Sequence, residues 1–80
     1  MYYTYILKSQ RDQKHYYGSA EDMGVRLKNH NAGKVRSTKS RRPFVMVYSE
    51  EYATKREALT REKFFKSIDG YRWLKMQEII

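Results

Sequence analysis

Two tyrosines near the start of the chain are the first candidates for chemistry. Tyr5 and Tyr16 lie in two segments rich in β-forming residues, 2–8 and 14–18, which a polar turn at 9–13 separates. Adjacent antiparallel strands bring such side chains together on one face of a sheet, where two phenols either pack or act on water. Because a free phenol has a pKa of about 10, activation of water at neutral pH requires a nearby cation.

A second pair of polar residues follows in a predicted helix. Arg26 and His30 are four residues apart, so they share one face of that helix. The planar guanidinium of Arg26 is suited to holding a phosphate, and His30 is suited to moving a proton or holding a phosphate oxygen. A solvated helix face is the alternative interpretation, and helical spacing does not decide between the two.

Glu62 is the most informative single residue, because it shares the spacing of an apolar stripe. The stripe consists of Ala58, Leu59 and Phe65. A carboxylate in a buried stripe is costly unless a cation or hydrogen bonds satisfy it. Mg²⁺ prefers oxygen ligands, often one carboxylate together with water and phosphate. Glu62 is therefore the candidate metal ligand, with an ion pair to a neighbouring basic residue as the alternative.

A run of positive charge lies in the segment 32–42, which contains no acidic residue. Its basic residues, all suited to contacting phosphates, are Lys34, Arg36, Lys39, Arg41 and Arg42. The whole chain carries 17 Lys and Arg against 9 Asp and Glu, a formal net charge of +8. Such a charge favours polyanions through counterion release, so nucleic acid is the expected partner and a merely solvated loop the alternative.

Three strands and three helices are expected to position these residues. The strands are 2–8, 14–18 and 44–50, and the last is apolar on both faces, as in a central or covered strand. The helices are 20–30, a second from the capping box of Thr54 and Glu57 to about residue 67, and a third over 70–80. The predicted fold is therefore α+β, a three-stranded antiparallel sheet flanked by helices, in the order β-β-α-β-α-α.

Some finer features of the helices are also expected. Met23 and Leu27 are one turn apart and are predicted to face the core, and Gly33 supplies a left-handed stop after the first helix. In the last helix the apolar stripe consists of Trp73, Met76 and Ile80.

Length and composition narrow the class of protein. Eighty residues allow one domain, expected to span 1–80. The absence of cysteine excludes disulfides and thiolate metal sites, and the two histidines cannot form a structural zinc site alone. No apolar run approaches membrane-spanning length, and the first residues are too short and polar for a signal peptide. We therefore expect a cytoplasmic protein with no membrane partner.

These residues together resemble the GIY-YIG nuclease family, which is named for two short motifs on its first two strands. Here the motifs are Tyr3-Thr4-Tyr5 and Tyr16-Tyr17-Gly18, followed at similar spacing by Arg26, His30 and Glu62. The resemblance covers nearly the whole chain and is closest to the short stand-alone bacterial members. The departures are Tyr3-Thr4 in place of Gly-Ile, Tyr17 in place of Ile, Ser19 where some members have a lysine, and no asparagine after Asn31.

The resemblance implies an endonuclease that hydrolyses a nucleic-acid phosphodiester, DNA favoured, in a single displacement with Mg²⁺ or Mn²⁺. It implies that Tyr5 or Tyr16 positions or activates water and that Arg26 neutralises charge on the phosphate. It further implies that Glu62 holds the metal and that His30 assists proton transfer or phosphate binding. DNA repair or recombination is the expected setting.

Two other functions stay open at this point. One is a non-catalytic nucleic-acid-binding module that keeps the nuclease fold, although Tyr5, Arg26 and Glu62 favour catalysis. The other is a subunit whose basic face docks an acidic protein. Larger family members gain targeting from extra domains, so a protein partner for targeting is also considered.

Overall fold

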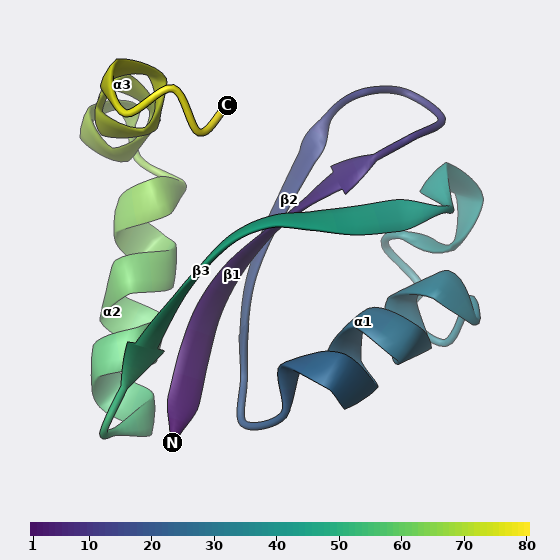
Figure 1. Ribbon diagram of the computed structural model, residues 1–80, viewed down its shortest axis with the longest axis horizontal. Helices are drawn as coiled ribbons and strands as arrows, with labels where there is room; N and C mark the ends of the chain where they lie inside the picture. The colour runs from purple at the N-terminus through teal and green to yellow at the C-terminus, as the bar shows by residue number, and fades with distance from the viewer.

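The computed structural model describes residues 1–80, which form three strands, three α-helices and one 3-10 turn (Figure 1). In chain order the elements are β1 (Tyr2–Ser9), β2 (His15–Ala20), α1 (Met23–Asn31), η1 (Lys39–Arg41), β3 (Phe44–Tyr52), α2 (Lys55–Phe65) and α3 (Ile68–Met76). The predicted class and the order β-β-α-β-α-α are confirmed. The short turn η1, inside the predicted loop, was not indicated by any pattern.

The sheet is antiparallel, with β1 in the centre and the strand order β2-β1-β3. Tyr5 lies opposite Gly18, and Leu7 lies opposite Tyr16. Because alternate residues of a strand face the same side, Tyr5, Leu7 and Tyr16 share one face of the sheet. The hairpin register therefore places the two candidate phenols on the same side.

β3 is an edge strand, so residues 44–50 do not form a central strand, but α1 and α2 contact the strand from opposite faces of the sheet. Consecutive residues of β1 pair with Tyr48 and Met46, which leaves Val47 as a bulge. The extra residue inverts the alternation, so Met46 packs on one face of the sheet and Tyr48 on the other. The bulge therefore explains why the sequence of β3 is apolar on both faces although the strand has only one neighbouring strand.

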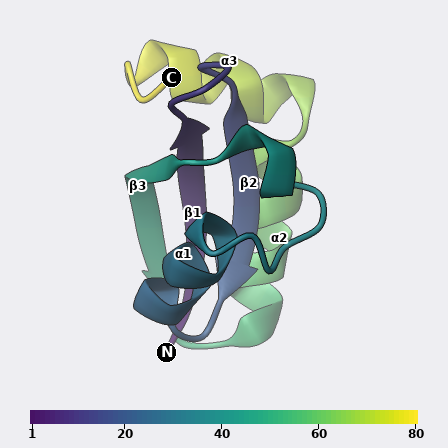
Figure 2. The ribbon, with the colours of Figure 1, turned by 90° about the vertical axis from the view of Figure 1, so that its right-hand side faces the viewer.

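Helices cover both faces of the sheet (Figures 1 and 2). On one face α1 packs over Tyr5, Leu7 and Phe44, and its Met23 and Leu27 contact this cluster as predicted. This α1 face carries the candidate phenols.

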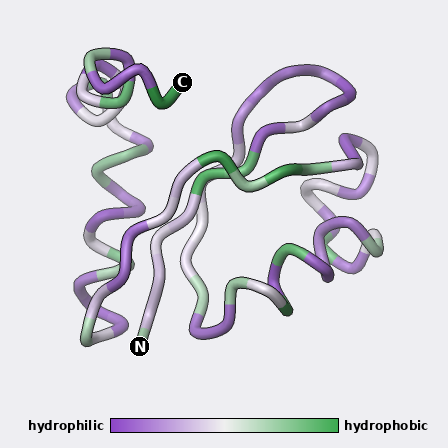
Figure 3. The backbone as a smooth tube through the Cα atoms, viewed as in Figure 1, coloured by the Kyte–Doolittle hydropathy of each residue, from purple (hydrophilic) through white to green (hydrophobic).

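On the other face α2 and α3 cover a second cluster, formed by Ile6, Phe65 and Leu74. The Thr4 hydroxyl donates to the carbonyl of Ala58 at 2.7 Å, which fixes α2 to the central strand. The residues are hydrophobic where the strands cross the middle of the molecule and hydrophilic in the β1–β2 turn (Figure 3). The core is thus divided by the sheet into two clusters.

The start of α1 differs from the predicted helix 20–30, because β2 continues to Ala20 and Asp22 caps the helix. The Asp22 carboxylate accepts from the backbone N–H of Val25 at 3.0 Å. Gly33, at φ +79°, provides the predicted left-handed stop.

The start of α2 is as predicted, since the Thr54 hydroxyl accepts from the backbone N–H of Glu57 at 3.2 Å. The predicted stripe holds only in part. Ala58 and Phe65 are buried, whereas Leu59 is 39 % exposed, so the inclusion of Leu59 was wrong.

The last helix spans Ile68–Met76 rather than 70–80, with Ser67 as its N-cap. Met76 is 80 % exposed, so its place in the predicted stripe was wrong, and Leu74 is the buried residue instead. Ile80 lies beyond the helix and packs against the second cluster. No helix of the protein has the length and apolar character needed to cross a membrane.

Candidate active site

Tyr5 lies on the central strand and is 1 % exposed. Its ring lies over Gly18, where a Cβ would stand only 2.5 Å from the phenolic oxygen. The absence of a side chain at Gly18 is therefore what lets the Tyr5 hydroxyl reach this position. The Tyr16 ring lies beside it, with centroids 6.4 Å apart.

α1 brings the two predicted helix residues to the same hydroxyl. The Arg26 Nε–H donates to the Tyr5 oxygen at 3.2 Å, and the His30 Nε2 lies 3.1 Å from that oxygen. The Tyr16 ring packs edge-on against the His30 ring at 4.8 Å. Four of the predicted residues therefore form one polar cluster on the α1 face.

Thr38 extends this cluster, because its hydroxyl lies 2.8 Å from the His30 Nδ1. One arrangement gives every hydrogen an acceptor. Arg26 donates to Tyr5, Tyr5 donates to Nε2, Nδ1–H donates to Thr38, and Thr38 donates to the Val35 carbonyl at 3.3 Å. A proton on Nε2 instead would leave the Tyr5 hydrogen without an acceptor within the chain.

The environment of the cluster sets its protonation. Burial lowers the pKa of His30 to about 4, and the charge of Arg26 acts in the same direction. His30 is therefore neutral at pH 7, with one ring nitrogen able to accept a hydrogen bond. Burial raises the pKa of Tyr5, while the hydrogen bond and charge of Arg26 oppose that rise. Arg26 is thus the cation that stabilises a Tyr5 phenolate.

Glu62 comes from α2, which packs on the face of the sheet opposite to the one where the other four candidates meet. Its carboxylate is nevertheless close enough to add to the rise in the pKa of Tyr5 that burial causes. On α2, Arg61 and Glu62 flank the buried positions on opposite sides. Arg61 reaches Glu50 of β3 at 2.8 Å, so Glu62 is turned toward β2. A ligand that contacts both Arg26 and Glu62 must therefore pass the free edge of β2.

The Glu62 carboxylate is held by Lys66, one turn further along α2, at 2.9 Å. This is the ion-pair alternative that the sequence left open. The protein contains no group of three or more His, Asp or Glu residues able to hold a metal ion. A single carboxylate fits a Mg²⁺ ion that shares its remaining positions with water and substrate phosphate, but not a cage made by protein alone.

The basic loop is more ordered than a solvated run of charge. Arg41 donates to the Asp12 carboxylate at 2.7 Å and holds the pKa of that carboxyl at about 2. The expectation that every charge of the loop is unpaired therefore fails for Arg41. Lys34, Arg36 and Lys39 are exposed and form no ion pair. Thr38 belongs to the same loop and is hydrogen-bonded to His30, so the basic residues of the loop lie next to the His30 cluster in the chain.

Arg42 is likewise held locally, its Nε–H donating to the Lys39 carbonyl at 2.8 Å, and it forms no ion pair. Two further residues of the cluster were missed. No spacing rule connects Thr38 with His30 across a loop, and the contact of Gly18 with Tyr5 emerges only from the hairpin register.

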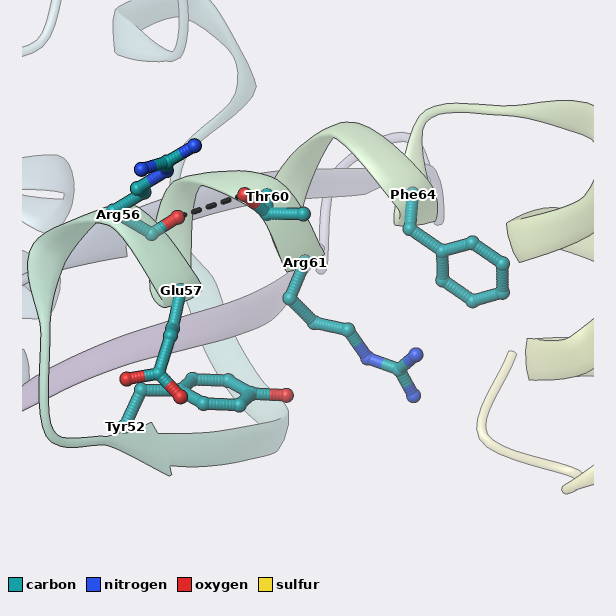
Figure 4. A pocket seen from close by; sticks show the side chains of 6 residues that line it. All are labelled: Tyr52, Arg56, Glu57, Thr60, Arg61 and Phe64. Carbon is teal, nitrogen blue, oxygen red and sulfur yellow. Dashed lines mark hydrogen bonds between the residues drawn. The ribbon is translucent and has the colours of Figure 1, made fainter.

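A separate pocket of about 500 Å³ lies beside α2, lined by Tyr52, Arg56, Glu57, Thr60, Arg61 and Phe64 (Figure 4). The Thr60 hydroxyl is bonded back to the Arg56 carbonyl at 2.9 Å. The Arg61 charge is neutralised by Glu50, which also accepts from the Tyr52 hydroxyl at 2.6 Å. Most of its polar side chains are thus satisfied within the protein, Tyr52 and Arg61 by Glu50, Glu57 by Thr54, and Thr60 by the Arg56 carbonyl.

Comparison with known proteins places the chain in a family. Residues 1–70 match the GIY-YIG catalytic domain. The chain is 41 % identical over 78 residues to UPF0213 protein SH2523 of Staphylococcus haemolyticus, which covers 96 % of this chain and 94 % of that protein. It is 38 % identical over 68 residues to UPF0213 protein YazA of Bacillus subtilis, covering 84 % and 68 % of the two chains.

A solved structure supports the same assignment. The solution NMR structure of UPF0213 protein BH0048 from Bacillus halodurans matches with a TM-score of 0.57 and 32 % sequence identity, over 96 % of this chain and 85 % of that one. The two family motifs lie on β1 and β2, where Tyr5 and Tyr16 share a face. The chain belongs to the GIY-YIG nuclease family.

Proposed function

We propose that this protein is a metal-dependent endonuclease that hydrolyses nucleic-acid phosphodiesters, with DNA as the favoured substrate and repair or recombination as its setting. The observation that carries the proposal is the directed hydrogen-bond chain from Arg26 through Tyr5 to His30. It links a cation, a phenol and a neutral imidazole, which are the groups needed to take a proton from attacking water.

In this proposal the Tyr5 oxygen takes a proton from water as the water oxygen bonds to phosphorus, and in the same step it passes its own proton to His30 Nε2, its hydrogen-bond acceptor. Arg26 stabilises the negative charge that develops on the Tyr5 oxygen during this transfer. The bond to the leaving oxygen of the strand then breaks, that oxygen takes a proton from solvent water, and His30 returns its proton to solvent through Tyr5. Tyr16 orients the water, and Arg26 also offsets the negative charge that develops on the phosphate.

Glu62 is the residue that would hold Mg²⁺ or Mn²⁺, with water and substrate phosphate as the other ligands. When bound, such an ion supplies charge stabilisation at the attacked phosphate and the leaving oxygen. Glu62 must exchange its contact with Lys66 for that role. The basic loop residues Lys34, Arg36, Lys39 and Arg42 would grip neighbouring phosphates, while Arg41 is committed to Asp12.

One observation favours a second candidate, a nucleic-acid-binding module without catalysis. The Glu62 carboxylate is already paired and belongs to the face opposite the Tyr5 cluster. Under this alternative the chain binds nucleic acid with the same salt dependence but cuts nothing.

Cleavage assays separate the two candidates. Single-stranded, duplex and branched DNA and RNA are each incubated with the protein and Mg²⁺, Mn²⁺ or a chelator. The proposal predicts metal-dependent cutting of at least one substrate, loss of cutting in Glu62→Gln, and normal cutting in the matched control Glu51→Gln, an exposed residue of β3. Binding of every substrate class without cutting of any would establish the second candidate instead.

A further inference from the structure

A second concentration of positive charge surrounds His15, outside the predicted loop. His15 begins β2 opposite Lys8 of β1, on the face that α3 covers. Burial lowers the pKa of His15, and the charges of Lys8, Lys75 and Arg41 lower it further. Positive groups from β1, α3 and η1 are therefore close to this one imidazole, with no acidic group acting on it. We call Lys8, His15, Tyr71 and Lys75 the hairpin–α3 surface.

Tyr71 adds an exposed aromatic ring to this surface. It is 51 % exposed on α3, and the Lys75 ammonium lies 5.6 Å from its ring centroid. Burial raises the pKa of Tyr17 of β2 and the neighbouring Tyr71 adds to that rise, which places Tyr71 beside the same strand as His15. An exposed ring beside unpaired cations is a common arrangement for binding a nucleic-acid strand, whose phosphates meet the cations while a base stacks on the ring.

The charges of this surface have no partner within the protein. The three ion pairs of the chain join Arg41 to Asp12, Arg61 to Glu50, and Lys66 to Glu62. Neither Lys8 nor Lys75 takes part in one. Like charges held together without acids oppose folding, so their gathering is best explained by a polyanionic ligand.

Most of the acidic residues lie at the other end of the molecule. Five of the nine lie in the β2–α1 connection, at the end of β3 and at the start of α2, near the N-terminus in Figure 1: Glu21, Asp22, Glu50, Glu51 and Glu57. Three others belong to the hairpin turn and to α3 or the residues after it, namely Asp12, which pairs with Arg41, Asp69 and Glu78. The β1–β2 turn and α3 lie toward the opposite end. The acidic charge thus weighs more on the N-terminal end of the molecule than on the hairpin–α3 surface, whose lysines form no ion pair.

We propose that the hairpin–α3 surface is a second binding site for the substrate strand, which takes its phosphates on Lys8 and Lys75 and stacks an unpaired base on Tyr71. This inference rests on the proposed function. Arg41 connects the surface with the basic loop, because it pairs with Asp12 of the hairpin turn and acts on His15. The Cα trace is 28 Å long, so a stacked strand of about eight nucleotides spans the whole molecule.

The test is the salt dependence of binding, measured by anisotropy with a labelled single-stranded DNA of about twelve nucleotides in chelator. The double variant Lys8→Gln, Lys75→Gln should reduce the slope of log affinity against log salt by about 1.4, or about 0.7 for each lost phosphate contact. The control Lys55→Gln, Lys63→Gln removes the same charge from α2 and should retain more of the wild-type slope. Equal slopes for the two double variants would overturn the proposal.

Tyr71 supplies an independent test of the same site. Tyr71→Leu should weaken binding of the single strand about tenfold, whereas Tyr71→Phe should bind like wild type, because stacking needs only the ring. Equal binding by both variants would contradict a stacked base. If the wild type cuts no substrate yet these effects are seen, the catalytic proposal fails and the binding surface stands. If it binds no nucleic acid, the surface belongs to an acidic partner and the present inference is wrong.

Discussion

The two faces of the sheet bury different kinds of side chain. On the α1 face the buried groups include Tyr5, His30 and Thr38, which satisfy one another through hydrogen bonds. On the α2–α3 face Phe65 stacks on Trp73 with centroids 6.2 Å apart, and Ile6, Leu74 and other apolar side chains complete the packing. The difference indicates that the two faces have different roles. The α2–α3 face stabilises the fold, and the α1 face positions the polar groups proposed for catalysis.

The largest expected effect tests the stabilising face. Phe65→Ala should lower the free energy of unfolding by about 3–5 kcal/mol, because it removes a buried ring and leaves a cavity. Leu59→Ala, on the exposed side of the same helix, should cost less than about 1 kcal/mol. Urea denaturation of the two variants checks the contrast. Similar losses would show that the second cluster is not the main source of stability.

The next effect concerns the pH dependence of the α1 face. His30 has a folded pKa of about 4, below its unfolded value of about 6.5. As pH falls below 6.5 the unfolded chain takes up the proton first, so stability is full above 6.5 and declines toward pH 4. The loss is about 3 kcal/mol. Urea denaturation between pH 7 and 4.5 should show this decline.

A matched pair of variants shows which histidine causes the loss of stability at low pH. His30→Gln should remove most of the decline, whereas His15→Gln should remove a smaller part, since the pKa of His15 is lowered too. The carboxyl pKa values of Asp12 and Glu50 are lowered below their ordinary range, so they act only at more acidic pH. A larger change in His15→Gln than in His30→Gln would contradict the account.

A smaller effect tests the hydrogen-bond chain itself. Thr38→Val should cost about 1–3 kcal/mol of unfolding free energy, because the buried His30 Nδ1–H loses its acceptor. Thr38→Ser keeps the hydroxyl and should recover most of that loss. Thr60→Val, an exposed control, should be nearly neutral. Thermal denaturation of the three variants suffices, and equal behaviour of the Val and Ser variants at Thr38 would rule out the bond.

The smallest expected effect is that of Glu62→Gln on stability. It removes only an i,i+4 ion pair with Lys66, which is worth about 0.3–0.5 kcal/mol. A nearly unchanged denaturation midpoint would confirm that Glu62 is dispensable for folding. A loss above about 1 kcal/mol would instead indicate a structural role for the carboxylate.

Local patterns predicted much of this fold, and long-range pairing accounts for the errors. Thr54 caps α2 and Gly33 ends α1 through contacts with nearby residues of the chain, so both roles could be predicted from the sequence. Strand alternation likewise predicted that Tyr5 and Tyr16 share a face. The bulge at Val47 depends on how β3 pairs with β1, and it inverted the pattern from which strand position was inferred.

The position of the candidate metal ligand shows the same limit. A buried stripe indicates that α2 packs on the sheet, but not on which face, and that choice makes Glu62 approach the Tyr5 cluster from the opposite side of the sheet. The bond between His30 and Thr38 crosses a loop whose path no periodicity describes. The closeness of Tyr5, Tyr16, Arg26 and His30 was therefore predictable from local patterns, whereas the path of the loop and the side from which Glu62 approaches were not.

The most direct test of the proposed catalysis is the single-turnover cleavage rate of Tyr5→Phe with Mg²⁺, on whichever substrate the wild type cuts. The phenolic oxygen joins Arg26 to His30, so its removal should lower the rate about a hundredfold to ten-thousandfold while nucleic-acid affinity is kept. Tyr3→Phe, on the same strand and without such a bond, should cut at the wild-type rate. A Tyr5→Phe variant that cuts as fast as Tyr3→Phe would contradict the role of Tyr5 in activating water.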